Sequence, residues 1–119
     1  RIQLVTLLGR LFSSSKGGYS ITYAKQFKIF NKRFNDISPT IRSIMVEFGV
    51  SMLSRKPDMT DLDGVLKGLE TRLNDGDPEV RLKVVHEVCD AVHSNVQSRA
   101  TDLLPLVGAR AMDKKNEHP

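Results

Sequence analysis

Apolar residues recur along the chain at three- and four-residue spacing, which is the period of an α-helix with one buried face. The apolar positions of successive stretches are Ile2, Leu4, Val5, Leu8, Leu11 and Phe12; Tyr23, Phe27, Phe30 and Phe34; Ile41, Ile44, Met45, Phe48 and Met52; Leu62, Val65, Leu66, Leu69 and Leu73; Val80, Val84, Val88, Ala91 and Val92; and Leu103, Leu104, Val107 and Met112. A polar linker over residues 13–18 and the Lys56-Pro57-Asp58 segment interrupt the pattern. The chain is therefore predicted to be all-α.

Two ten-residue segments of the chain resemble each other. Residues 33–42 read RFNDISPTIR and residues 72–81 read RLNDGDPEVR, so five of ten positions are identical at an offset of 39. The repeated motif consists of Asn35, Asp36, Pro39 and Arg42 in the first copy, and of Asn74, Asp75, Pro78 and Arg81 in the second, with Arg33 and Arg72 preceding them. An ordered set of this kind indicates an internal repeat.

The chemistry of each segment is that of a turn between two helices. Asn and Asp side chains bind nearby backbone groups, and they end one helix or cap the next. Ser38 and Asp77 occupy the N-cap position before a proline at the first helical position, where its missing N–H is not needed. The repeated Asp and Arg are expected to form a stacked hydrogen-bonding ladder, which is a structural role.

Helix pairs with a period of 39 residues fit the HEAT class of α-solenoid, whose period is about 40–47 residues, better than the 34-residue tetratricopeptide class. We predict a solenoid fragment of about two full helix-turn-helix repeats, with a half-repeat at each end. The predicted units are the second helix of a preceding repeat (1–12), two repeats (19–55 and 60–96) and the first helix of a further repeat (100–113). The chain is expected to be a fragment of a longer protein.

Several of these segments also resemble one particular family, the "precocious dissociation of sisters" regulators of cohesin. The resemblance rests on Arg33-Phe34-Asn35-Asp36-Ile37-Ser38, the Pro57-Asp58 break, Val80-Arg81, the upstream Leu7-Leu8-Gly9-Arg10-Leu11-Phe12 and the downstream Ala111-Met112-Asp113-Lys114-Lys115. It departs from the family at Asn116-Glu117-His118-Pro119, where a Val-Arg helix start would be expected.

The resemblance implies a non-enzymatic scaffold without cofactors. Such a scaffold binds the kleisin subunit of cohesin, acts with release and acetylation factors, and maintains or dissolves sister-chromatid cohesion on chromatin in the nucleus. No kleisin contact is assigned to a residue of this chain.

Composition and charge exclude several other classes of protein. A single cysteine, Cys89, cannot form an internal disulfide, and no apolar run is long enough to span a membrane. The net charge of +4 is unevenly distributed, because residues 1–56 carry ten basic and two acidic side chains, whereas residues 57–119 carry eight and twelve. A uniformly basic tail is thus excluded, but a basic face on a folded body is not.

A basic helix face is the leading candidate binding site. Lys25, Lys28 and Lys32 lie opposite the Phe27 stripe, Arg33 flanks the turn, and no acidic residue precedes Asp36. This face is predicted to contact an acidic partner segment, DNA phosphate or an inositol phosphate. The alternative is a solvated surface that keeps the protein soluble.

Two further patterns are weaker candidates for chemical sites. His86, Cys89 and His93 have half-site spacing for a metal, but a closed zinc site needs four ligands; a half-buried Cys89 and surface histidines explain the pattern better. Ser13-Ser14-Ser15-Lys16 matches Ser-x-x-Lys without the companion motifs of penicillin-binding enzymes, so a phosphorylatable serine cluster is the better interpretation.

Three functions remain open from the sequence alone. The first is a cohesin-regulating scaffold, the second is a polyanion- or nucleic-acid-binding HEAT module, and the third is a HEAT adaptor in transport.

Overall fold

The computed structural model describes residues 1–14, 18–55, 62–95 and 98–113, and all its regular elements are helices. In chain order they are α1 (Ile2–Phe12), α2 (Tyr19–Thr22), α3 (Ala24–Asn31), the 3-10 helix η1 (Lys32–Asn35), α4 (Pro39–Arg55), α5 (Leu62–Arg72), α6 (Pro78–Ser94), the 3-10 helix η2 (Arg99–Leu103) and α7 (Leu104–Asp113). The all-α prediction is confirmed. The Lys56-Pro57-Asp58 break and residues 15–17 of the linker lie outside the described residues.

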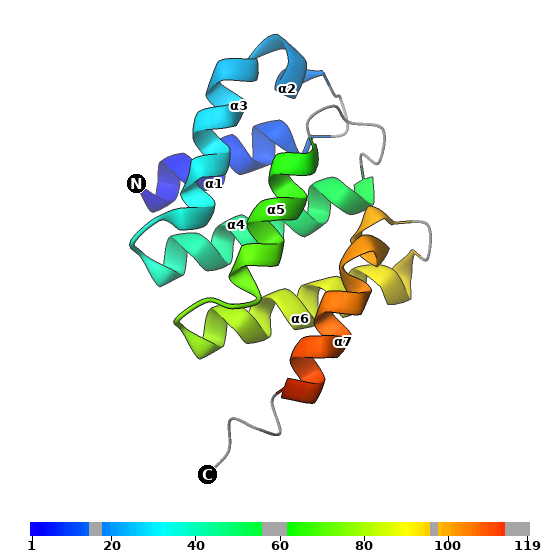
Figure 1. Cartoon of the computed structure of the whole chain (residues 1–119). Helices are drawn as coiled ribbons and strands as arrows, with labels where there is room; N and C mark the ends of the chain where they lie inside the picture. Colours follow the sequence, from blue (N-terminus) through cyan, green and yellow to red (C-terminus); the bar gives the residue numbers. More distant parts are fainter. Residues whose placement is uncertain (15–17, 56–61, 96–97, 114–119) are drawn as a thin grey trace.

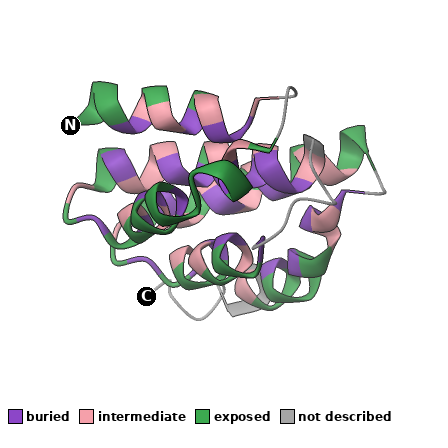
Figure 2. Cartoon of the chain, turned by 90° about the horizontal axis from the view of Figure 1, so that it is seen from above, coloured by how far each residue is buried: buried purple, intermediate pink, exposed green. Residues whose placement is uncertain are grey.

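The helices form two layers (Figure 1). α1, α4 and α6 lie side by side in one layer, and α4 packs against both of its neighbours. α3, α5 and α7 cross them in the second layer. The resulting body is elongated, with extents of 48 × 32 × 19 Å, and every long helix has both buried and exposed residues (Figure 2).

Equivalent positions of α1 and α4 are buried in the same way, whereas those of α6 are more exposed. With Arg1, Arg42 and Arg81 aligned, Val5 corresponds to Val46 and Phe12 to Leu53, and all four of these apolar side chains are buried. The same alignment places Cys89 of α6 at the position of Val50, which is 5% exposed in α4. Cys89 itself is exposed, so the prediction that it is half-buried was wrong. The reason is that α4 has a neighbour on both sides, whereas α6 lies at the edge of its layer (Figure 1).

The predicted stripe of four aromatic residues is interrupted at its first member. Phe27, Phe30 and Phe34 are buried, but Tyr23 is 45% exposed. The backbone at Tyr23 leaves the helical region (φ −116°, ψ 50°) and separates α2 from α3. Tyr23 instead stacks on Tyr19, with 6.3 Å between the ring centroids.

The side chain of Phe34 holds the first repeated turn against the next helix pair. η1 places its ring, which is 1% exposed, against two helical glycines. A Cβ atom at Gly49 of α4 would lie 3.0 Å from the ring, and one at Gly68 of α5 would lie 2.4 Å from it. Because these two glycines lack side chains, a full aromatic ring fits between α4 and α5. Protein interiors are close-packed, so little free space remains around the ring.

Two further structural findings concern the predicted elements. The last predicted helix begins as η2 and continues as α7, with Leu103 and Val107 buried and Leu104 exposed. Within the residues described, no helix is long and apolar enough to cross a membrane.

Candidate functional site: the turn ladder and the lysine strip

Each repeated turn is organised by one buried aspartate. Asp36 accepts a hydrogen bond from the Ser38 N–H at 2.9 Å, and Asp75 accepts one from the Asp77 N–H at 2.8 Å. Both aspartates are nearly inaccessible to solvent. Asp77 in turn caps α6 by accepting from the Glu79 N–H at 2.8 Å, which satisfies a backbone donor of the first helical turn.

Arg42 links the two turns. Its Nε and Nη2 donate to the two carboxylate oxygens of Asp75 at 2.7 and 3.0 Å, a bidentate contact between successive helix pairs. Its Nη1 donates to the main-chain oxygen of Asp36 at 2.8 Å. Arg72 completes the site by donating to Asp75 Oδ2 at 2.7 Å. The guanidinium of Arg42 therefore holds the carboxylate of the second turn and the backbone of the first.

The same contacts recur at neighbouring positions, and together they form the Asp–Arg ladder. Arg33 donates to Asp36 as Arg72 does to Asp75, and Arg81 donates to the Asp75 carbonyl as Arg42 does to the Asp36 carbonyl. Arg1 donates to Asp36 at 3.1 Å, in the way that Arg42 donates to Asp75. The ladder thus runs along the edge of the molecule where the turns lie, and its members are Arg1, Arg33, Asp36, Arg42, Arg72, Asp75 and Arg81.

The other residues of the repeated motif have smaller roles. Pro39 and Pro78 are the first residues of α4 and α6. Asn35 and Asn74 are both exposed, and Asn35 accepts a hydrogen bond from Arg72 at 3.3 Å.

The electrostatics of the ladder are strongest at Asp75. Burial alone would raise the pKa of this carboxyl group, but hydrogen bonds from Arg42 and the Asp77 N–H, with the charges of Arg42 and Arg72, outweigh burial and lower it below 3.8. The hydrogen bond to Asp75 raises the pKa of Arg42, with burial acting against it. The folded state therefore favours the charged form of both partners.

This shift predicts that acid destabilises the fold. Because the folded pKa of Asp75 is lowered, its contribution to stability is complete above the ordinary value of 3.8 and is lost as the pH falls through the folded pKa. In urea unfolding at a series of pH values, the free energy of unfolding of the wild type should fall more steeply below that value than that of an Asp75→Asn variant. Parallel pH profiles would show that Asp75 does not carry this dependence.

The predicted basic face separates into two parts. Lys25, Lys28 and Lys32 are exposed on α3 and at the start of η1, and we call them the lysine strip. Among the described residues, none of the three forms an ion pair. Arg33 is different, because its guanidinium is held by Asp36. Arg33 therefore belongs to the ladder by its contacts.

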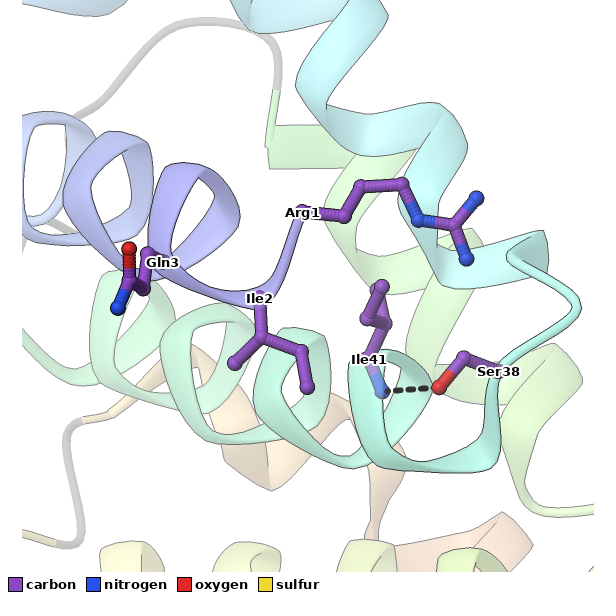
Figure 3. A pocket seen from close by; sticks show the side chains of 5 residues that line it. All are labelled: Arg1, Ile2, Gln3, Ser38 and Ile41. Atoms are coloured by element: carbon purple, nitrogen blue, oxygen red, sulfur yellow. Dashed lines mark hydrogen bonds between the residues drawn. The ribbon is translucent and has the colours of Figure 1, made fainter.

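A small pocket lies where α1 and α4 begin (Figure 3). It has a volume of about 320 Å³ and is lined by Arg1, Ile2, Gln3, Ser38 and Ile41. Ser38 Oγ accepts from the Ile41 N–H at 3.3 Å, and Arg1 is paired with Asp36. Arg1 and Ser38 are thus both engaged in the turn, and Ile2 and Ile41 form the aliphatic part of the pocket lining.

The remaining sequence candidates are scattered over the surface or engaged locally. His86, Cys89 and His93 are all exposed on α6, and no group of three or more potential metal-binding side chains occurs within the described ranges. Ser13 is buried and donates its hydroxyl to the Gly9 carbonyl at 2.6 Å, so it lacks the exposure that a member of a phosphorylatable serine cluster needs. Ser15 and Lys16 lie outside the described residues.

Some contacts could not be assigned from sequence reasoning. Arg1 enters the ladder from the start of α1, outside the two copies of the repeated turn, and Lys83 pairs with Glu47 across α4 and α6. The spacing of Arg1 and Arg42, 41 residues apart, is the one available signal for the first contact. Gly49 and Gly68, which pack against Phe34, carry no such signal, because neither glycine recurs at the offset of 39.

The fold and its ladder define a class: a helical-repeat segment whose successive helix pairs are joined through buried Asp–Arg contacts. Comparison with known proteins identifies the family within it. The family described as "Sister chromatid cohesion protein PDS5 protein" matches residues 1–117, and the chain belongs to this family.

Individual relatives agree with the family match. The chain is 30% identical over 114 residues to "Sister chromatid cohesion protein PDS5 homolog A" of Arabidopsis thaliana, which covers 96% of this chain and 7% of the relative. It is 29% and 28% identical over 116 residues to homologs A and B of Homo sapiens, which covers 97% of this chain and 8% of each. The chain thus spans less than a tenth of the length of these relatives. No solved structure matches it, and its assignment to the HEAT class stays a prediction.

Proposed function

We propose that this chain is part of a non-enzymatic scaffold that regulates sister-chromatid cohesion. The observation that carries the proposal is the family match over residues 1–117, which spans both copies of the repeated turn. The relatives are named for sister chromatid cohesion. The proposed place of action is chromatin in the nucleus.

The proposed partners are the kleisin subunit of cohesin and the factors that release or acetylate the ring. An elongated body built from two helical layers supports this role, because it offers long exposed faces to an extended partner. The division into repeats over 19–55 and 60–96, flanked by the helices at 1–12 and 100–113, is part of the same proposal. Each helix pair contributes one part of the exposed face, and the ladder fixes how the parts from successive pairs are aligned.

The engaged polar groups favour a scaffold over an enzyme. The serine of the Ser-x-x-Lys pattern donates its hydroxyl to the Gly9 carbonyl, and the buried carboxylates are neutralised by arginines in the turns. A nucleophile or a general base needs an available atom beside its substrate. The serine hydroxyl and the buried carboxylates instead stabilise the fold.

Depletion of the gene product from dividing cells tests the proposed function. Sister chromatids should separate before anaphase in metaphase spreads, and re-expression from a resistant copy should restore pairing. Normal pairing and normally timed separation after complete depletion would contradict a role in cohesion.

A further inference from the structure

The internal repeat shows which exposed residues of α3 remain surface when a helix pair has neighbours on both sides. At the offset of 39, Lys25, Lys28 and Lys32 correspond to Gly64, Lys67 and Thr71 of α5. α5 lies between α3 and α7, and all three of these residues are still exposed (Figure 1). The lysine strip therefore occupies positions that face solvent in the middle of the layer.

The apolar residue beside the strip behaves differently. Ile29 is exposed on α3, and its counterpart in α5 is Gly68, against which Phe34 packs. The exposure of Ile29 is therefore a property of the edge of the layer, where a further helix can pack. Ile29 is left out of the strip for this reason.

The repeat architecture does not require the positive charge. Of the three equivalent positions in α5, one is lysine and two are uncharged, and α5 is helical across all three. The three lysines lie on one side of the helix that runs through α3 into the start of η1, within about 60° of one another, opposite the buried Phe27 and Phe30. The lysine strip is a local addition of charge to a surface that packing leaves open.

The dimensions of the strip restrict its ligand. Seven residues separate Lys25 from Lys32, which corresponds to about 10 Å along the helix. On α5 the equivalent positions carry a single lysine, Lys67, so the strip does not continue as a row of positive charge across the neighbouring helix. A nucleic acid duplex, whose binding is driven by many phosphate contacts, fits this short strip poorly.

Compact polyanions and single-stranded nucleic acids also fit poorly. An inositol phosphate carries many charges close together, so it needs basic side chains that converge on one point. The three lysines instead lie along one convex helix. The two aromatic side chains between them, Phe27 and Phe30, are buried and cannot stack on bases. Three ammonium groups at three- and four-residue spacing match three carboxylates spaced in the same way on a partner.

We propose that the lysine strip docks an acidic segment of a partner protein whose carboxylates repeat at three- and four-residue spacing. Exposed ion pairs contribute little each and are screened by salt, so the contact is weak and salt-dependent. Electrostatic complementarity of this kind raises the association rate and sets the register more than it adds affinity. The site is distinct from the proposed cohesin role, and either can fail without the other.

An NMR titration of the 119-residue chain tests the proposal. The probe is an alanine-based helical peptide with glutamates at three- and four-residue spacing, and its control is the same peptide with glutamines. The glutamate peptide should cause saturable amide shifts confined to residues 24–32, which weaken at high salt. The glutamine peptide should cause none.

Two double variants with the same change in net charge locate the contact. Lys28→Glu/Lys32→Glu should weaken binding of the glutamate peptide at least about tenfold, which corresponds to about 1.4 kcal/mol. Arg10→Glu/Lys67→Glu changes two exposed basic residues elsewhere and should alter it less than about threefold.

Three results would overturn the proposal. One is the absence of saturable shifts with the glutamate peptide, and another is equal weakening by both double variants. The third is stronger binding of a DNA duplex or inositol hexakisphosphate to the same residues, which would make the strip a general polyanion site.

Discussion

Replacing Asp75 by asparagine should lower the free energy of unfolding by about 3–5 kcal/mol, the range for removing one partner of a buried ion pair. The side chain of Asp75 is fully buried, and those of Arg42 and Arg72 are only 14% and 13% exposed. The variant keeps the size of the side chain but leaves both guanidinium groups without a counter-charge in a poorly hydrated site. The measurement is urea unfolding of the 119-residue chain, followed by circular dichroism.

Two matched variants show whether burial of the partners decides the size of this effect. Asp36→Asn removes the equivalent carboxylate, but its partners Arg1 and Arg33 are 53% and 37% exposed, so water can replace the lost contact and the cost should be clearly smaller. Asp63→Asn removes a 97% exposed carboxylate whose contact with Arg99 is 3.9 Å long, and it should change stability by less than about 0.5 kcal/mol. Equal costs for Asp75 and Asp36 would contradict this account of the ladder.

Replacing Gly68 by alanine should lower the free energy of unfolding by about 1–3 kcal/mol, the usual cost of overpacking a core. The new Cβ would lie 2.4 Å from the ring of Phe34, so the ring or the helix must move. Gly64→Ala is the control on the same helix, where the new Cβ would meet Asn31 at an ordinary 3.6 Å. It should leave stability unchanged or raise it by up to about 1 kcal/mol, because alanine favours the helix.

A double-mutant cycle identifies the clash. Phe34→Leu introduces the smaller residue that stands at the equivalent position 73, and it makes room beside Gly68. The cost of Gly68→Ala should therefore be smaller in the Phe34→Leu background than in the wild type. Additive costs would show that the destabilisation has another origin.

The fold was predictable where the sequence carries local signals. The Asn-Asp and Pro residues of the two turns place the starts of α4 and α6, since capping and proline chemistry act over a few residues. The break at Tyr23 was missed because neither glycine nor proline marks it. A periodic apolar pattern continues through it, and only the backbone shows that the helix stops.

The residues of the candidate site could be predicted from the sequence, but their division into the ladder and the lysine strip could not. Helical spacing groups Arg33 with the three lysines, and sequence reasoning cannot show that Asp36, three residues on, is buried beside it. The exposure of Cys89 depends on whether α6 has a neighbour, which is a property of the layer and not of its own helix. Contacts between helix pairs, such as Arg42 with Asp75, become visible only when the pairs are placed together.

The same buried contacts bear on function. A scaffold presents a partner with surface strips in a fixed relative position, and the Arg42–Asp75 contact fixes two successive helix pairs. In the proposed scaffold, one partner could then read exposed residues of successive helix pairs as a single surface. The ladder is thus structural in itself, and in the proposed scaffold it holds the exposed faces in register.

Recovery of cohesin with the tagged gene product from nuclear extract tests the central claim most directly. The proposed function predicts that the subunits of the cohesin ring, the kleisin included, are enriched over an untagged control. A soluble, nuclear tagged protein that recovers no cohesin subunit would contradict it.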